Sequence, residues 1–135
     1  MKNKLDPNKV FSVFKNTDVE IYRENSMDDL LGNPYVILAM VLNAVMSYEK
    51  LDAMYLNSEK YSKTYKEKRP SIKNVYFEKI FFMLDTIGSP KELSFDDYHK
   101  KLVIESLSKV LRYFEDKEEF EKCARILPIL ELAKK

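Results

Sequence analysis

The sequence predicts an all-α protein, a single domain of residues 1–135 built as a bundle of four to five helices with a short irregular N-terminal segment. Only two of its 135 residues are glycine, fewer than tight β-hairpins or glycine-rich phosphate loops need. Few stretches alternate apolar and polar residues, whereas several have helical spacing. A chain of this length can bury a core, and a composition of 45% hydrophobic and 33% charged residues is that of a folded domain.

The N-terminal segment carries only short structural patterns. Asp6 can cap a helix that has Pro7 at its first position. Residues 18–24 alternate in a way that favours an extended chain, but a lone strand would have no partner to pair with. Residues 26–32 begin with a capping serine and end with a glycine, as one helical turn does. We therefore expect an irregular segment here.

The strongest helix is predicted to begin at Asn33-Pro34, which repeats the pattern of a capping residue followed by proline. From Tyr35 to Tyr48 it is apolar nearly all round, yet this run is shorter than the roughly 20 residues that span a bilayer. Two readings follow. The helix is the centre of the core, or a second subunit covers half of it.

The chain then becomes polar and basic up to Pro70, which disfavours helix at Arg69. We expect the third helix to run from Ser71 to Ile87, where Gly88 stops it. Its apolar stripe consists of Phe77, Ile80, Phe81, Leu84 and Ile87.

Two capping patterns precede the fourth helix. Residues 89–92 fit a capping box, and residues 94–97 nearly repeat it. The helix is expected from about Phe95 to Phe114. Its apolar face consists of Val103, Leu107, Val110, Leu111 and Phe114.

A charged turn leads into the fifth helix. Its predicted apolar face consists of Phe120, Cys123, Ala124, Leu127 and Leu130. Pro128 inside a helix removes a hydrogen bond and clashes with the preceding turn, at a cost of about 3 kcal/mol. The helix is therefore expected to kink there or to end near Leu127. The apolar residues that follow need cover, either from the core of the chain itself or from a partner.

Groups for catalysis or metal binding are scarce. His99 is the only histidine and Cys123 the only cysteine, too few for a zinc site or for a pair of Glu-x-x-His motifs. Asp96, Asp97 and His99 are read as a first helical turn with acidic residues near its positive end. The phosphate-binding motifs GxxxxGK[ST] and GxGxxG are absent. The sequence thus predicts a non-enzymatic protein with no cofactor and no metal.

The cellular setting is predicted from charge and cysteine use. A single cysteine fits a reducing cytosol, and the first residues are charged with no apolar run that would mark a signal peptide. The net charge of +1 gives no global attraction to nucleic acid or membrane. We expect a cytoplasmic protein without a membrane partner, located in the host cytoplasm or the virion if a phage encodes it.

Two charged segments are candidate binding sites. The first is a basic stretch interleaved with Tyr61 and Tyr65, which predicts a solvated face, a site for an acidic partner, or a nucleic-acid site where lysines meet phosphates and tyrosines stack on bases. Its basic residues are Lys60, Lys63, Lys66, Lys68, Arg69 and Lys73. The second is the acidic turn, which could bind a partner or pair head to tail with the basic stretch of another copy. Its candidate partner-binding residues are Glu115, Asp116, Glu118, Glu119 and Phe120.

Residues 115–133 resemble the UVR motif, a helical hairpin of bacterial excision-repair and Clp-adaptor proteins. Glu119, Phe120 and Glu121 match the start of its second helix, Cys123 and Ala124 stand for its small pair, and Ile126 stands for its leucine. The Arg-Asp pair of the motif falls on Leu127 and Pro128, where the sequence departs from it. The resemblance implies a small protein-docking hairpin and no enzymatic activity.

These observations predict a non-enzymatic helical protein–protein interaction module, such as a bacterial or phage accessory factor, that binds a protein partner or itself. One alternative is a nucleic-acid-associated accessory protein that uses the Lys60 to Lys73 patch. Another is a structural subunit of a larger assembly such as a virion. The apolar residues after Pro128 favour a last helix that completes the core over one that only docks a partner.

Overall fold

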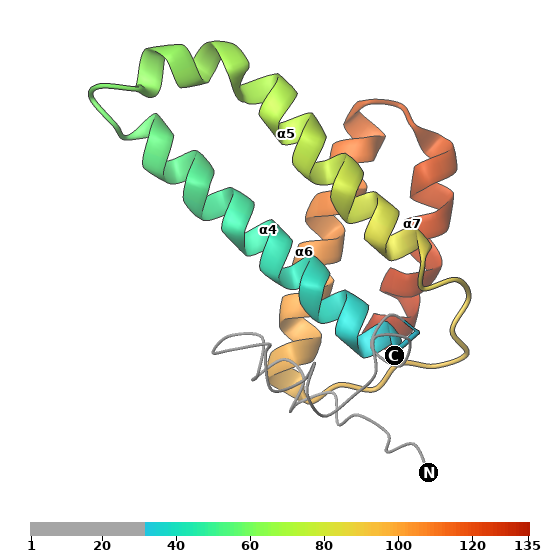
Figure 1. Cartoon of the computed structure of the whole chain (residues 1–135). Helices are drawn as coiled ribbons and strands as arrows, with labels where there is room; N and C mark the ends of the chain where they lie inside the picture. Colours follow the sequence, from blue (N-terminus) through green and yellow to red (C-terminus); the bar gives the residue numbers. More distant parts are fainter. Residues whose placement is uncertain (1–31) are drawn as a thin grey trace.

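Four helices make up most of residues 32–135, the part of the chain that the computed structural model describes (Figure 1). They are α4 (Pro34–Leu56), α5 (Ser62–Asp85), α6 (Asp97–Asp116) and α7 (Phe120–Lys134). No strand occurs between residues 32 and 135, so the predicted all-α class is confirmed. The expected irregular segment, with its helix start at Asp6, lies outside the described residues.

The helices form two antiparallel hairpins that pack against each other (Figure 1). α4 packs mainly against α5, and α6 mainly against α7. α5 contacts both helices of the second hairpin, while α4 contacts α6. Residues 57–61, the tip of the first hairpin, project beyond the second hairpin, so the first half of α5 has fewer neighbours than its second half (Figure 1).

α4 is the core helix that the sequence predicts. The Asn33 side chain caps it by accepting hydrogen bonds from the backbone N–H groups of Tyr35 (2.8 Å) and Val36 (3.4 Å), and Pro34 occupies the first turn. Its buried side chains are Val36, Ile37, Leu38, Ala39, Val41, Leu42, Val45 and Tyr48. Burial on several sides explains why this helix is apolar nearly all round.

The predicted break at Pro70 is wrong, because α5 runs through it without interruption. The carbonyl group that loses its helical donor is that of Lys66, an exposed residue, so water can bond to it instead. Tertiary contacts hold the helix on both sides of the proline. Before it, Tyr65 and Arg69 bond to Asp52 of α4. After it, Phe77, Ile80 and Leu84 of the predicted stripe are buried.

α6 begins at Asp97, the last residue of the second predicted capping pattern, so Ser94 is not the cap that this pattern predicts. Asp96 is its N-cap and accepts a hydrogen bond of 2.8 Å from the backbone N–H of His99. No helix follows the first pattern at residues 89–92, which lies in the connection between the hairpins. The connection is anchored to α4 where the backbone N–H of Ser94 donates to the Tyr35 hydroxyl at 3.0 Å. Val103, Leu107, Val110 and Phe114 are buried and Leu111 is half-buried, which confirms the predicted face.

The turn between α6 and α7 ends α6 with a Schellman motif. The N–H of Glu119 bonds to the Phe114 carbonyl (2.9 Å) and the N–H of Glu118 to the Glu115 carbonyl (3.0 Å). Glu118 has a φ of 59°, in the left-handed region where glycine is usual. The chain therefore makes a tight turn here without the glycine that would mark it in the sequence.

α7 continues through Pro128 to Lys134, so the alternative in which it ends near Leu127 is wrong. The predicted apolar face is also partly wrong. Phe120 is 63% and Leu127 44% exposed, and Ala124 is exposed as well. The buried side chains are Ile126, Ile129, Leu130 and Ala133. The last helix therefore completes the core, and the reason for its rotation is that it must pack against α5 as well as α6.

Candidate functional site

The two basic residues of the acidic turn, Lys117 and Lys122, both form ion pairs. Glu119 forms ion pairs with Lys117 (3.3 Å) and Lys122 (3.0 Å). Lys122 also donates to both carboxylate oxygens of Glu78 on α5, one of them at 2.8 Å. The hydrogen bond from Lys122 holds the pKa of the Glu119 carboxyl below its usual value. The two lysines thus tie the turn to itself and to α5.

The other acidic residues of the turn face solvent. Glu115, Asp116, Glu118 and Glu121 are exposed, and none forms an ion pair with a residue of the described part of the chain. Phe120 lies among them with most of its ring exposed. The structure thus brings four of the five predicted partner-binding residues to the surface. The fifth, Glu119, is paired with Lys117 and Lys122.

An apolar strip follows Phe120 along α7. Phe120, Ala124 and Leu127 are spaced as i, i+4 and i+7, which places them on one side of a helix, and all three are exposed. We call these residues the outer stripe of α7. They are the part of the predicted apolar face that the core does not use.

The basic stretch is divided between two environments. Lys60 lies in the hairpin tip with its amine 5.2 Å from the Tyr61 ring centroid, and Lys63, Lys66 and Lys68 are exposed on the first turns of α5. Arg69 and Lys73 instead line a groove between the hairpins. The stretch is therefore not one continuous site.

Tyr65 does not have the role that the sequence suggested for it. It is buried, its ring stacks on Tyr55 at a centroid distance of 5.3 Å, and its hydroxyl donates to Asp52 at 2.6 Å. A base cannot stack on a ring whose faces are covered by the protein.

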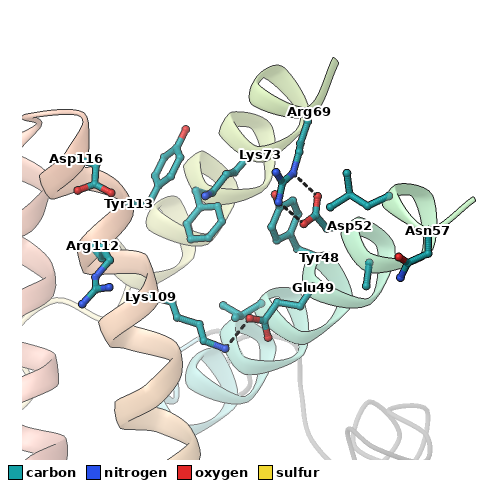
Figure 2. Close-up of a pocket in the computed structure, with 14 residues that line it drawn as sticks. Tyr48, Glu49, Asp52, Asn57, Arg69, Lys73, Lys109, Arg112, Tyr113 and Asp116 are labelled. Carbon is teal, nitrogen blue, oxygen red and sulfur yellow. Dashed lines mark hydrogen bonds and ion pairs between the residues drawn. The ribbon is translucent and has the colours of Figure 1, made fainter. Parts of the chain in front are cut away.

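A groove between α4, α5 and α6 is a candidate site that the sequence did not reveal (Figure 2). Its volume is about 620 Å³, and its walls carry both charged and aromatic side chains. A hollow of about 430 Å³ with Lys117 in its wall adjoins it, since the two share Arg69, Lys73 and Tyr113.

One wall of the groove is an ordered polar cluster centred on Asp52. Arg69 donates to its two carboxylate oxygens through Nε and Nη2, each at 2.8 Å (Figure 2). The Tyr65 hydroxyl donates to the same carboxylate at 2.6 Å. The hydrogen bonds from Arg69 lower the pKa of Asp52. Tyr48 lies beside this cluster, and its buried hydroxyl has no hydrogen-bond partner within the described part of the chain.

The opposite wall comes from α6. Lys109 donates to Glu49 of α4 at 2.6 Å, while Arg112 forms no ion pair with any described residue. Tyr113 stacks on Phe77 with ring centroids 4.5 Å apart. The amine of Lys73 lies 5.8 Å from the Phe77 centroid and 5.6 Å from the Tyr113 centroid. The sequence could have indicated the α5 side of the groove only if α5 had been predicted as continuous, because a continuous α5 puts Tyr65, Arg69, Lys73 and Phe77 on adjacent turns.

His99 and Cys123 both lie against other parts of the fold. The Nδ1 atom of His99 lies 2.8 Å from the Asp96 carboxylate that caps α6. The Sγ atom of Cys123 lies 4.0 Å from the carbonyl oxygen of Leu111, and burial raises the pKa of its thiol. No group of three or more His, Cys, Asp and Glu side chains within residues 32–135 is placed to hold a metal ion.

None of the helices in the described range is both long and apolar enough to cross a membrane. Comparison of the chain with models of protein families, with curated proteins and with solved structures finds no match.

Proposed function

We propose that this protein is a non-enzymatic interaction module that binds another protein through the acidic turn and the outer stripe of α7. The observation that carries the proposal is the position of Phe120. Its ring is 63% exposed and stands among four carboxylates that have no ion pair within the described chain. Exposed apolar patches with a polar rim mark protein-interaction sites, and aromatic residues are enriched among those that contribute most to binding.

The chemistry of the partner follows from this surface. Burial of Phe120 and Leu127 would be favourable by about 25 cal/mol for each Å² of apolar area removed from water. The rim of Glu115, Asp116, Glu118 and Glu121 would attract a basic surface and repel an acidic one. The expected partner segment therefore has an apolar patch that is bordered by lysine or arginine.

The form of the α6–α7 hairpin supports the same proposal. Two antiparallel arms joined by a short acidic turn are what the resemblance of residues 115–133 to the UVR motif implies. Of the small pair in that motif, Cys123 is half-buried and its Sγ faces Leu111 of α6, whereas Ala124 lies on the surface beside Phe120. A small residue there leaves room for a partner helix to approach α7.

The test compares two variants that each remove one exposed phenylalanine. Phe120→Ser alters the proposed surface, and Phe82→Ser alters a ring that is 73% exposed on α5. Tagged wild-type and variant chains are used as baits in extracts of the source cells, and captured proteins are quantified by mass spectrometry. Support requires a protein that Phe82→Ser retains and Phe120→Ser loses, and that binds again as a purified component.

The same variants test self-association as the form of binding. If the partner is a second copy of the chain, light scattering over a range of concentrations gives a mass above that of the 16.0 kDa chain for the wild type and for Phe82→Ser. Phe120→Ser would remain monomeric. The proposal fails if the wild type is monomeric and every captured protein binds Phe120→Ser as well as it binds the wild type.

A further inference from the structure

The groove between α4, α5 and α6 has the size of a small-molecule site. Its volume of about 620 Å³ lies within the 300–1,000 Å³ that is usual for ligand pockets. Three helices supply its walls, so that its side chains are held by packed elements rather than by loops (Figure 2).

The charges in the groove are not balanced pairwise. Arg69 and Lys109 are matched by Asp52 and Glu49. Lys73 and Arg112 form no ion pair with any residue from 32 to 135. Asp116 is the only other acidic residue in the wall, and it lies at the exposed end of α6. Lys73 is half-buried and stands between Arg69 and Tyr113 in Figure 2, which makes it the inner cation of the groove.

Tyr48 supplies an independent indication that the groove takes a ligand. The residue is only 5% exposed and lines the groove, and its hydroxyl, which lies near Arg69, forms no hydrogen bond of normal geometry with any residue from 32 to 135. An unpaired buried hydroxyl is unfavourable, and its O–H can donate to a suitable acceptor. Burial, and after it the nearby charge of Asp52, raise the pKa of Tyr48, so the group keeps its proton.

The remaining walls are apolar or aromatic. Val45 is almost fully buried at the groove, Leu56 is half-buried, and Phe77 and Tyr113 form a stacked pair. We propose that the groove binds a small organic anion, with its carboxylate or phosphate group on Lys73 and the Tyr48 hydroxyl and its apolar body against the Tyr113 ring, which lies close to the Lys73 amine. This site is separate from the α7 surface proposed above and does not depend on it.

The test is a titration of ¹⁵N-labelled full-length protein, followed by amide chemical shifts. The probes are phenyl phosphate, 3-phenylpropionate, inorganic phosphate and neutral 3-phenylpropanol. We expect one of the two aromatic anions to shift amides of α4, α5 and α6 saturably, with a dissociation constant of about 1 mM or tighter. Neutral 3-phenylpropanol should bind more weakly, and the preference between phosphate and carboxylate identifies the anionic group.

Matched variants connect binding to the groove. Lys73→Gln should weaken binding about tenfold, the loss expected for one hydrogen bond to a charged group. Lys63→Gln, which changes an exposed lysine of the same helix outside the groove, should have no effect. Tyr48→Phe, which keeps the ring and removes only the unpaired hydroxyl, should also weaken binding. A thermal melt of each variant checks that it is folded.

Three outcomes would each overturn the proposal. One is the absence of a saturable response in the groove for both aromatic anions. Another is binding of equal strength by 3-phenylpropanol, because the groove would then be only an apolar surface. The third is equal affinity in the wild type and in folded Lys73→Gln and Tyr48→Phe. If a single-stranded oligonucleotide bound more tightly than both anions and lost affinity on Lys63→Gln, the basic stretch would be a nucleic-acid site instead.

Discussion

Arg69 and Asp52 join the two helices of the first hairpin through two parallel hydrogen bonds of 2.8 Å, in the fork geometry that fits a guanidinium to a carboxylate. The pair lies one residue before Pro70. It connects α5 to α4 at the position where proline removes a hydrogen bond from the helix itself. A contact between helices thus supports the local structure that the proline weakens.

We predict that Asp52→Asn lowers the free energy of unfolding by about 1–2 kcal/mol, because it removes the negative charge that accepts three hydrogen bonds. The loss is no larger because the Arg69 side chain is partly exposed, so water already weakens the ion pair. Chemical denaturation at pH 7 measures the change. The matched control is Glu49→Gln, which breaks the pair with Lys109 between two half-exposed side chains and should cost less than about 0.5 kcal/mol. Equal effects of the two changes would contradict a special role for Asp52.

The same pair predicts a pH dependence. Its hydrogen bonds lower the pKa of Asp52 in the folded protein below the value of about 3.9 in the unfolded chain. The stabilisation is therefore complete above the unfolded pKa and is lost as the pH falls through the folded pKa. The difference in unfolding free energy between wild type and Asp52→Asn should be constant above about pH 5 and shrink below about pH 4. Denaturant titrations from pH 2 to pH 7 measure it, and a difference that stays constant throughout would refute the prediction.

A third prediction separates the two faces of α7. Ile129→Ala should destabilise the protein by about 2–5 kcal/mol, since its side chain is only 2% exposed. Leu127→Ala, on the outer stripe, should cost less than about 1 kcal/mol. Deletion of residues 129–135 removes Ile129, Leu130 and Ala133 from the core and should leave no cooperative thermal transition. If the truncated chain melted near the wild-type temperature, α7 would be a docking element and not part of the core.

The left-handed residue at the end of α6 gives a fourth prediction. Glu118→Gly should raise the free energy of unfolding by up to about 1 kcal/mol, because glycine adopts a φ of 59° without the strain of a side chain. Glycine also has more conformational entropy in the unfolded chain, which offsets part of this stabilisation. Glu115→Gly makes the same change within the last helical turn and should instead destabilise by about 1 kcal/mol. Thermal melts of the two variants should therefore shift in opposite directions.

The sequence was sufficient for the helices whose ends and faces are set by local chemistry. Asn33 caps α4 through its own side chain, as predicted, and the apolar residues of α6 repeat at helical spacing and are buried. The cap of α6 was missed by two residues, because Asp96 takes the place predicted for Ser94. The sequence failed where contacts between distant residues outweigh local preference. Pro70 was predicted to end a helix because nothing near it reveals that Asp52 will bind Arg69 from a neighbouring helix.

The site was less predictable than the fold for the same reason. Phe120, Ala124 and Leu127 have the spacing of a buried face, and only the packing of α7 against two helices decides that Ile126 and Ile129 are buried in their place. The groove depends on Tyr48, Lys73 and Arg112, which come from three helices and share no motif. Charge counting identified Arg69 and Lys73 as members of a basic stretch, but it could not separate them from the lysines of the exposed turns.

The short connections inside each hairpin have a consequence for the rate of folding. Three residues separate α6 from α7 and five separate α4 from α5, so the contacts within each hairpin join parts of the chain that are near each other in sequence. Closing such loops costs little chain entropy, and folds rich in local contacts reach the native state in microseconds to milliseconds. The slower step is then the docking of one hairpin on the other, across the longer connection of residues 86–96. Substitutions at Val110 or Phe77, where the hairpins meet, would change the height of that barrier more than substitutions in either turn.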